Sequence, residues 1–171
     1  MKRALSLLFV LSIATPLFAN PLIEFADGNY KIINSPDTKF EEIKHLNDDS
    51  IKAHFGLDDK WSYVRIEAKN GSWDLSKYQG VEVTITNEGN APAKPGVRID
   101  QAGDLGARAW NTALLKEIQP GETETVQVTF GKDYNQPKEI DISKIAAVHV
   151  FLGQSREEPS TLIISNIRPI E

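Results

Sequence analysis

Residues 74–78 read Asp-Leu-Ser-Lys-Tyr and lead, two residues on, into 81–86, Val-Glu-Val-Thr-Ile-Thr. Residues 141–145 read Asp-Ile-Ser-Lys-Ile and lead, one residue on, into 147–152, Ala-Val-His-Val-Phe-Leu. Asp and Ser favour turns because their side chains bond nearby backbone N–H groups, and each turn precedes a run of strand length. We expect both turns to enter strands of one β-sandwich, with the apolar residue after each Asp plugging the end of its core.

Most of the remaining chain alternates between apolar and polar residues over runs of strand length. In one such run Val64 and Ile66 face one way and Arg65 the other. A period of two places one face of a strand in a core and the other in solvent. Clusters of Gly, Pro and Asn separate the runs, which is typical of an antiparallel sandwich. The predicted strands are 22–25, 30–33, 50–55, 63–68, 81–86, 96–100, 109–115, 123–130, 146–152 and 162–168.

Helical periodicity is weak throughout the chain. The best helical candidates are 38–46 and 112–117, and the second competes with the strand predicted over 109–115. The sequence leaves helix and strand both open at that second segment. The predicted fold class is all-β, an antiparallel β-sandwich of galactose-binding-like jelly-roll type, for which about eight to ten strands are expected.

The first 19 residues have the pattern of a signal peptide. Lys2 and Arg3 precede an apolar stretch, and Ala19 offers a small residue at the cleavage position. The apolar stretch is shorter than the roughly 20 residues of a membrane span, and no Cys follows it for lipid attachment. We therefore expect 1–19 to be a signal peptide, 20–171 to form a single β-sandwich domain, and the protein to be periplasmic or secreted.

The composition argues against several classes of function. Without Lys2 and Arg3, 17 basic residues stand against 24 acidic ones, a net charge of −7 that disfavours nucleic acid and anionic membranes. The chain has no Cys, which excludes zinc–thiolate sites and thiol catalysis. His45, His54 and His149 lack metal-ligand spacing, no Ser lies in a nucleophile elbow, and nothing selects a catalytic carboxylate pair. We therefore expect a protein that is not an enzyme.

A series of motifs resembles a known family. Residues 73–80 read Trp-Asp-Leu-Ser-Lys-Tyr-Gln-Gly, followed by Thr-Asn-Glu-Gly at 86–89 and Val-Arg-Ile-Asp at 97–100. This order resembles the galactose-binding-like jelly rolls that serve as non-catalytic carbohydrate-binding modules on polysaccharide-degrading enzymes. In particular, it is similar to the N-terminal module that precedes the catalytic barrel in glycoside hydrolase family 50 agarases. Residues 22–28 and 164–168 resemble the opening and closing strands of that module, so the likeness spans nearly all of the predicted domain.

The resemblance implies a structural calcium between the first and last strands, but the chain departs from that pattern. At the positions of the family's two carboxylates this chain has Ala26 and Ser165. A hard cation needs six or more oxygens, several of them charged. Glu24 and Asp27 remain nearby as candidate ligands, yet the loss of two carboxylates argues against the ion. We predict no cofactor and no metal.

Sugar-binding sites combine aromatic rings, which stack on the apolar faces of pyranose rings, with polar side chains that bond the hydroxyls. The predicted ligand-binding residues, drawn from strand ends, one polar strand face and the loop after it, are Trp61, Arg98, Asp100, Gln101, Arg108 and Trp110. Packing against the core is the alternative for the aromatic residues, and we favour it for Trp73 and Tyr78.

A polar groove would form if the strands that carry Arg65, Arg98 and His149 were neighbours in one concave sheet. The alternative is a solvated sheet face with cross-strand ion pairs, each worth little. We favour that alternative for Arg65 and Glu67. For Arg98 and Asp100 the two interpretations stay open.

The leading prediction is a non-catalytic carbohydrate-binding module that recognises a polysaccharide or oligosaccharide outside the cytoplasm. A structural or protein-interaction module of an exported complex is the main alternative, and a small glycan-active enzyme is the third. The expected partner is carbohydrate, together with a separate secreted glycoside hydrolase, because the resemblance extends to no catalytic domain. Nucleic acid and membrane insertion are not expected.

Overall fold

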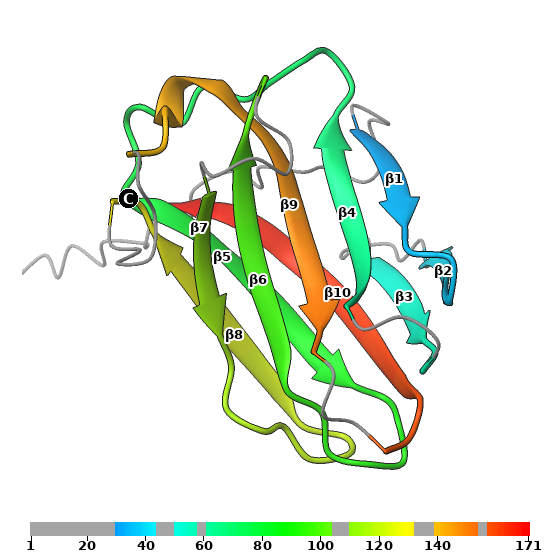
Figure 1. Cartoon of the computed structure of the whole chain (residues 1–171). Coiled ribbons are helices and arrows are strands. Elements are labelled where there is room, and N and C mark those ends of the chain that lie inside the picture. The colour runs from blue at the N-terminus through cyan, green and yellow to red at the C-terminus, as the bar shows by residue number, and fades with distance from the viewer. Residues whose placement is uncertain (1–29, 44–49, 58–60, 104–109, 132–138, 154–156) are drawn as a thin grey trace, which may run out of the picture.

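The computed structural model describes residues 30–43, 50–57, 61–103, 110–131, 139–153 and 157–171. These residues form ten strands and a short 3-10 helix, η2 (Figure 1). The elements are β1 (Tyr30–Asn34), β2 (Thr38–Ile43), β3 (Ser50–Phe55), β4 (Ser62–Ala68), β5 (Gly80–Asn87), β6 (Pro95–Gln101), β7 (Trp110–Leu114), β8 (Thr123–Thr129), η2 (Ile142–Lys144), β9 (Ile145–Leu152) and β10 (Ser160–Ile170).

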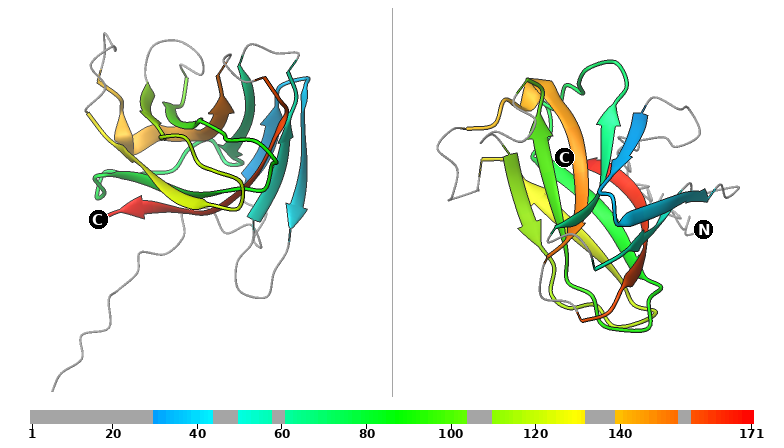
Figure 2. Two further views of the ribbon diagram at one scale, coloured as in Figure 1. Left: turned by 90° about the horizontal axis from the view of Figure 1, so that it is seen from below. Right: turned by 45° about the vertical axis from the view of Figure 1, so that its right-hand side comes forward.

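The strands form two five-stranded sheets that pack face to face. The first sheet has the order β1-β4-β9-β6-β7 and the second β2-β3-β10-β5-β8, and the strands pair antiparallel in both. Figure 1 looks onto the first sheet with the second behind it, and Figure 2 shows the two layers from other sides. The chain crosses between sheets repeatedly, as from β4 to β5 and from β8 to β9. The predicted antiparallel sandwich of jelly-roll type is confirmed.

The core lies between the sheets and is built from the apolar members of the alternating runs. Val64 and Ile66 of β4 and Ile99 of β6 are fully buried, as are Val83 of β5 and Ile164 of β10. Each such aliphatic side chain contributes about 1.5–3 kcal/mol by leaving water. Because one face of the first sheet is committed to this core, its polar residues are displayed on the opposite, outer face.

The two recurring turns have the same local structure. Oδ1 of Asp74 accepts hydrogen bonds from the backbone N of Ser76 at 3.0 Å and from its Oγ at 2.6 Å. Oδ1 of Asp141 accepts the same pair of bonds from Ser143 at 3.1 and 2.6 Å. The bond from the serine hydroxyl is the main reason why the pKa of each carboxyl lies below its ordinary value. The sequence recurrence is therefore a structural recurrence.

The two turns also lie side by side and bond each other. The N of Leu75 donates to the carbonyl of Ile142 at 2.9 Å, and Trp73 and Ile145 exchange two backbone hydrogen bonds. Leu75 is 2% exposed and closes the end of the core as predicted, whereas Ile142 is only partly buried and Ile145 takes the fully buried place. Trp73 and Tyr78 pack against the core, which confirms the prediction for both.

The helical candidate over 38–46 does not form a helix within the described residues. Thr38–Ile43 is strand β2, which pairs with β3 along its whole length, and 44–46 lie outside the described residues. A helix of so few residues is marginal by itself, so the hydrogen bonds offered by a neighbouring strand decide the conformation. The choice between a helix over 112–117 and a strand over 109–115 is decided in favour of the strand, because Trp110–Leu114 forms β7, which pairs with β6. The other predicted strands within the described residues are confirmed to within two residues at each end.

Several predictions fall outside the described residues. These are the signal peptide over 1–19, the strand over 22–25, and the residues Glu24, Asp27 and Arg108. Within the described part of the chain, no helix has the length and apolarity that a membrane crossing requires. The same part contains no group of three or more His, Cys, Asp or Glu side chains arranged to hold a metal ion.

Candidate functional site

The outer face of the first sheet carries a row of polar side chains in register across four strands. Arg65 of β4 lies opposite His149 of β9, and His149 lies opposite Arg98 of β6. Arg98 in turn lies opposite Thr112 of β7. Neighbouring strands are about 4.8 Å apart, so these side chains stand next to one another. The structure thus brings together the three strands whose adjacency a polar groove requires.

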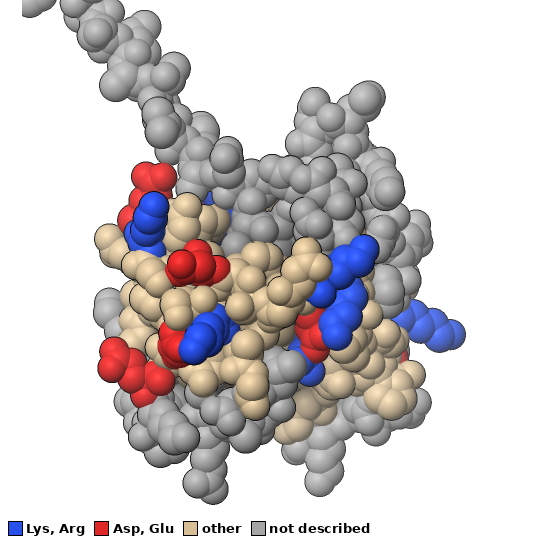
Figure 3. All heavy atoms as spheres, turned by 90° about the horizontal axis from the view of Figure 1, so that it is seen from above, with Lys and Arg blue, Asp and Glu red and all other residues tan. Residues whose placement is uncertain are grey.

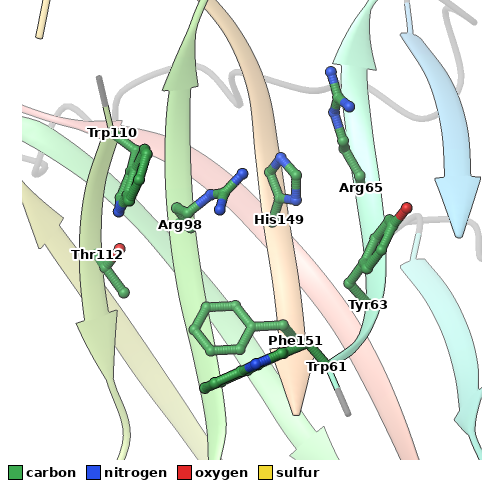
Figure 4. A pocket seen from close by; sticks show the side chains of 8 residues that line it. All are labelled: Trp61, Tyr63, Arg65, Arg98, Trp110, Thr112, His149 and Phe151. Atoms are coloured by element: carbon green, nitrogen blue, oxygen red, sulfur yellow. The ribbon is translucent and has the colours of Figure 1, made fainter. Parts of the chain in front are cut away.

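This row forms the centre of a pocket of about 510 Å³ (Figure 4). Figure 4 shows the ring of Trp110 on the β7 side, the ring of Tyr63 on the β4 side, and the rings of Trp61 and Phe151 at one end of the pocket. A pocket of this volume lies within the usual range for small-ligand sites, roughly 300–1,000 Å³. The lining residues are Trp61, Tyr63, Arg65, Arg98, Trp110, Thr112, His149 and Phe151.

Asp100 holds the polar centre in place without lining the pocket itself. It lies two residues after Arg98 on β6, and its side chain is 1% exposed. Its Oδ1 is 2.8 Å from Nε of Arg98, and its Oδ2 accepts a hydrogen bond from Nη2 at 2.8 Å. Nε2 of His149 lies 2.7 Å from the same Oδ2. A two-point contact of this kind fixes the plane of a guanidinium group, so Asp100 orients Arg98 as well as His149.

Burial and pairing act on the pKa values of this cluster in opposite directions. Burial raises the pKa of Asp100, but the hydrogen bonds and positive charges of His149 and Arg98 outweigh it, so the pKa lies below 3.8. Burial also lowers the pKa of His149, and its contact with Asp100 offsets this only in part. The charges of Arg98 and Arg65 lower it further, and the pKa lies below 6.5. Near pH 7 the cluster therefore holds an ionised Asp100 and a neutral His149.

Trp110 stands beside Arg98 on the edge strand β7. Cζ of Arg98 lies 5.0 Å from the centre of the Trp110 ring, which is a cation–π contact. Arg98 is therefore held from two directions, by the carboxylate of Asp100 and by the indole ring. The side chain remains 27% exposed, so part of its guanidinium faces the pocket.

A second aromatic group lies at the end of the pocket. The rings of Trp61 and Phe151 meet edge to face, with their centres 5.8 Å apart. The Phe151 ring lies over Gly96 so closely that a Cβ there would come within 2.2 Å of it, so only glycine admits the ring in this position. Trp61 lies over Gly153 in a looser contact and is 57% exposed, which makes it the most accessible aromatic surface of the pocket.

Glu67 of β4 makes the expected cross-strand ion pair, with Lys31 of β1, and also contacts Arg65, but its carboxylate is not solvated. The Glu67 side chain is 7% exposed and contacts both Lys31 and Nη2 of Arg65. The side chains of Lys31 and Arg65 lie against the carboxylate, which is largely withdrawn from solvent. Nε and Nη2 of Arg65, like Nε of Arg98, are buried and make no hydrogen bond of good geometry among the described residues. Arg65 is thus only partly satisfied within the protein.

The other predicted site residues divide into three groups. Trp61, Arg98 and Trp110 line the pocket, while Asp100 supports it from within the sheet. Gln101 does not line it: its Oε1 accepts a hydrogen bond from the N of Asp141 at 2.8 Å and so anchors the second turn. Arg108 lies outside the described residues.

Five of the lining residues are absent from the predicted ligand-binding set. Arg65 and His149 had been named only as parts of a polar groove, and the remaining three are Tyr63, Thr112 and Phe151. Each lies two residues from a side chain that had been considered, namely Arg65, Trp110 and His149 in turn. A strict period of two along each strand would have placed all six on one face. The missing information was which strands are neighbours, and no signal in the sequence supplies it.

Comparison with known proteins places the fold. No protein-family model matches the chain, and no curated protein matches its sequence. Among solved structures, an exo-β-agarase matches 87% of this chain and 25% of its own length, at 15% identity and a TM-score of 0.63. A family 11 carbohydrate-binding module from Clostridium thermocellum, in complex with a β-1,3-1,4-mixed-linked tetrasaccharide, matches 83% of this chain and 88% of its own, at 13% identity and a TM-score of 0.57. A family 30 carbohydrate-binding module of a cellulosomal cellulase from C. thermocellum matches 84% and 91%, at 13% identity and a TM-score of 0.57.

At these identities the likeness shows the fold. This chain spans about a quarter of the length of the exo-β-agarase, so it resembles one part of that enzyme and nearly the whole of the two binding modules. The resemblance to family 50 agarases and to jelly-roll carbohydrate-binding modules is confirmed at this level. The comparisons thus show the β-sandwich fold that this chain shares with these modules.

Proposed function

We propose that this protein is a non-catalytic carbohydrate-binding domain whose ligand lies along the pocket of the first sheet. The observation that carries the proposal is the combination, on one sheet face, of a polar centre with aromatic rings, of which Trp61 is exposed and the others are partly buried. Trp61 and Trp110 offer ring faces for pyranose stacking, and Arg65, Arg98 and Thr112 offer polar groups for the hydroxyls. The fold shared with carbohydrate-binding modules supports the same function.

The charges of the pocket support binding rather than catalysis. A glycosidase needs a carboxylic acid whose pKa is raised so that it can protonate the leaving group. Asp100 is the carboxylate next to the polar centre, and its pKa is lowered by His149 and Arg98 despite its burial. Glu67 is tied to two cations and is almost completely buried. Both carboxylates therefore serve as counter-ions of the basic side chains.

The proposal includes a place of action outside the cytoplasm, in the periplasm or the medium. It rests on the signal-peptide pattern over 1–19, since polysaccharides of the kind bound by such modules occur outside the cell. A separate secreted glycoside hydrolase is the proposed protein partner. A pocket with one stacking site at each side should bind an oligosaccharide weakly, at roughly micromolar to millimolar Kd.

Affinity electrophoresis tests this function directly. Purified protein is run through native gels that contain agarose, carrageenan, alginate, laminarin or xylan. We expect retardation by at least one glycan, and about tenfold weaker retardation of Trp110→Ala because a stacking surface is lost. Leu57→Ala serves as the matched control, since Leu57 is a large exposed apolar residue that does not line the pocket. Free migration of the wild type in all five gels would contradict the proposal, and release of reducing ends would assign an enzymatic activity instead.

A further inference from the structure

We propose that the pocket selects an anionic glycan, one that carries carboxylate or sulfate groups on its sugar rings. This proposal rests on the proposed function and names the class of ligand for the same site. Carboxylate and sulfate groups share one chemistry: both are anionic, and their oxygens accept hydrogen bonds but cannot donate them.

The first observation is the charge of the pocket. Arg65 and Arg98 are the only charged side chains in its lining, with no Asp or Glu among the described lining residues. Their counter-ions, Glu67 and Asp100, are withdrawn, with side chains 7% and 1% exposed against 17% and 27% for the two arginines. Lys31 adds a third cation at the β1 edge of the cluster and is 59% exposed. The cluster thus has three cations and two carboxylates, and its accessible part is positive.

The second observation is the hydrogen-bonding character of the centre. A guanidinium group has donors and no acceptor, and it matches the oxygens of a carboxylate or sulfate in planar geometry. Figure 4 shows the guanidinium groups of Arg98 and Arg65 on either side of the His149 ring. A neutral sugar hydroxyl is both donor and acceptor, so it would leave part of this donor-rich surface unmatched.

The third observation is how each arginine is held within the protein. Asp100 binds the guanidinium of Arg98 at two points, and Cζ of Arg98 lies 5.0 Å from the centre of the Trp110 ring. Arg65 is paired with Glu67 through Nη2 alone. Nε of both arginines and Nη2 of Arg65 are buried without a hydrogen bond of good geometry among the described residues, so neither guanidinium is fully satisfied. We therefore assign the main contact with the anionic group to Arg65, which the protein holds at fewer points, and a supporting contact to Arg98.

The net negative charge of the chain does not prevent this selection. Figure 3 shows acidic and basic side chains next to one another on the end of the sandwich that is uppermost in Figure 1. At physiological salt, charges more than about 8 Å apart in solvent are largely screened. A local positive pocket therefore acts on a bound anion more strongly than the distant acidic residues do.

Two pairs of glycans that differ in charge provide the test. Polygalacturonate is compared with its methyl ester for carboxylate, and carrageenan with agarose for sulfate, using the full-length protein and isothermal titration or gel affinity. We expect at least about tenfold tighter binding to the anionic member of one pair at low salt, with a preference that falls as NaCl is raised. The pair that shows the preference identifies the anionic group.

Two variants test whether Arg65 causes the preference for the anionic glycan. Arg65→Gln should reduce the ratio of the two affinities to less than about threefold. Lys144→Gln should leave the ratio unchanged, because Lys144 is an exposed cation at the η2 turn away from the pocket. Thermal unfolding of both variants verifies that they are folded. If Arg65→Gln does not fold, the wild-type preference and its salt dependence still decide the question.

The remaining outcomes separate this proposal from the proposed function. Equal affinity for both members of both pairs would overturn the anionic selection and leave carbohydrate binding intact. Binding of poly-L-glutamate as tight as that of the anionic glycan would also overturn it, since the attraction would then be unspecific. No binding to these four glycans, nor to alginate, laminarin or xylan, would overturn both proposals.

Discussion

Two carboxylates of the chain, Asp100 and Asp37, are each surrounded by hydrogen-bond donors, and they differ in what those donors are. Asp100 is held by Arg98 and His149 at the pocket. Asp37 lies in the turn between β1 and β2, and its Oδ1 and Oδ2 accept hydrogen bonds from the hydroxyls of Ser35 and Ser62 at 2.8 and 2.6 Å.

The Asp37 cluster is complete in itself. The carbonyl of Asp37 accepts a hydrogen bond from the N of Gly56 at 3.0 Å, so one residue joins the β1–β2 turn to the segments on either side of 58–60. Hydroxyls have one proton to donate, and here each is directed at a protein acceptor. A guanidinium group has five N–H donors, so after it has bound a carboxylate some of its donors remain available to another partner. The difference indicates a structural role for Asp37 and a supporting role in binding for Asp100.

Asp100→Ala should have the largest effect, because it removes a partner from two side chains at once. Breaking a buried ion pair leaves an uncompensated charge, and we expect a loss of about 3 kcal/mol in the free energy of unfolding. Glycan retardation should disappear as well, since Arg98 would lose its fixed orientation. Urea denaturation and the native gels measure the two effects, and unchanged binding would show that Asp100 does not support the pocket.

Asp37→Ala should affect stability alone. Two buried or partly buried hydroxyls would lose their acceptor, at about 2 kcal/mol in total by urea denaturation. Binding should stay within about twofold of the wild type at temperatures where the variant is folded, because no residue of the Asp37 cluster lines the pocket. Asp74→Ala, which removes an exposed Asp with a similar serine contact, is the matched control and should destabilise less. A clear loss of binding in Asp37→Ala would remove the distinction between the two clusters.

The smallest expected effect is a dependence of stability on pH that comes from His149. Its pKa is lowered in the folded protein, chiefly by burial, so the unfolded chain binds more protons below about pH 6.5. The contribution is therefore present above that pH and is lost as the pH falls through the folded pKa. We expect the free energy of unfolding to decrease from pH 7 to pH 5 in the wild type and to change less in His149→Gln. Equal pH dependence in both proteins would show that His149 does not titrate in this way.

The strands were predictable because each is a local pattern. Val64 and Ile66 alternate with Arg65, and the alternation requires one buried face whatever the rest of the chain does. The same reasoning failed for Thr38–Ile43, where no strong pattern opposed a helix and the pairing with β3 decided the outcome. The turns at Asp74 and Asp141 were read correctly, since a short side chain and the backbone two residues on settle their structure.

By itself the sequence determined the all-β class, the two Asp–Ser turns and the face on which Arg98 and Asp100 stand. All of these depend on contacts within a few residues or on the two-residue period of a strand. Only the tertiary structure decided that β4, β9, β6 and β7 are neighbours in one sheet, and with it that Arg65, His149, Arg98 and Trp110 share a pocket. It also decided that Glu67 and Asp100 are buried counter-ions, because their burial comes from strands far away in the chain.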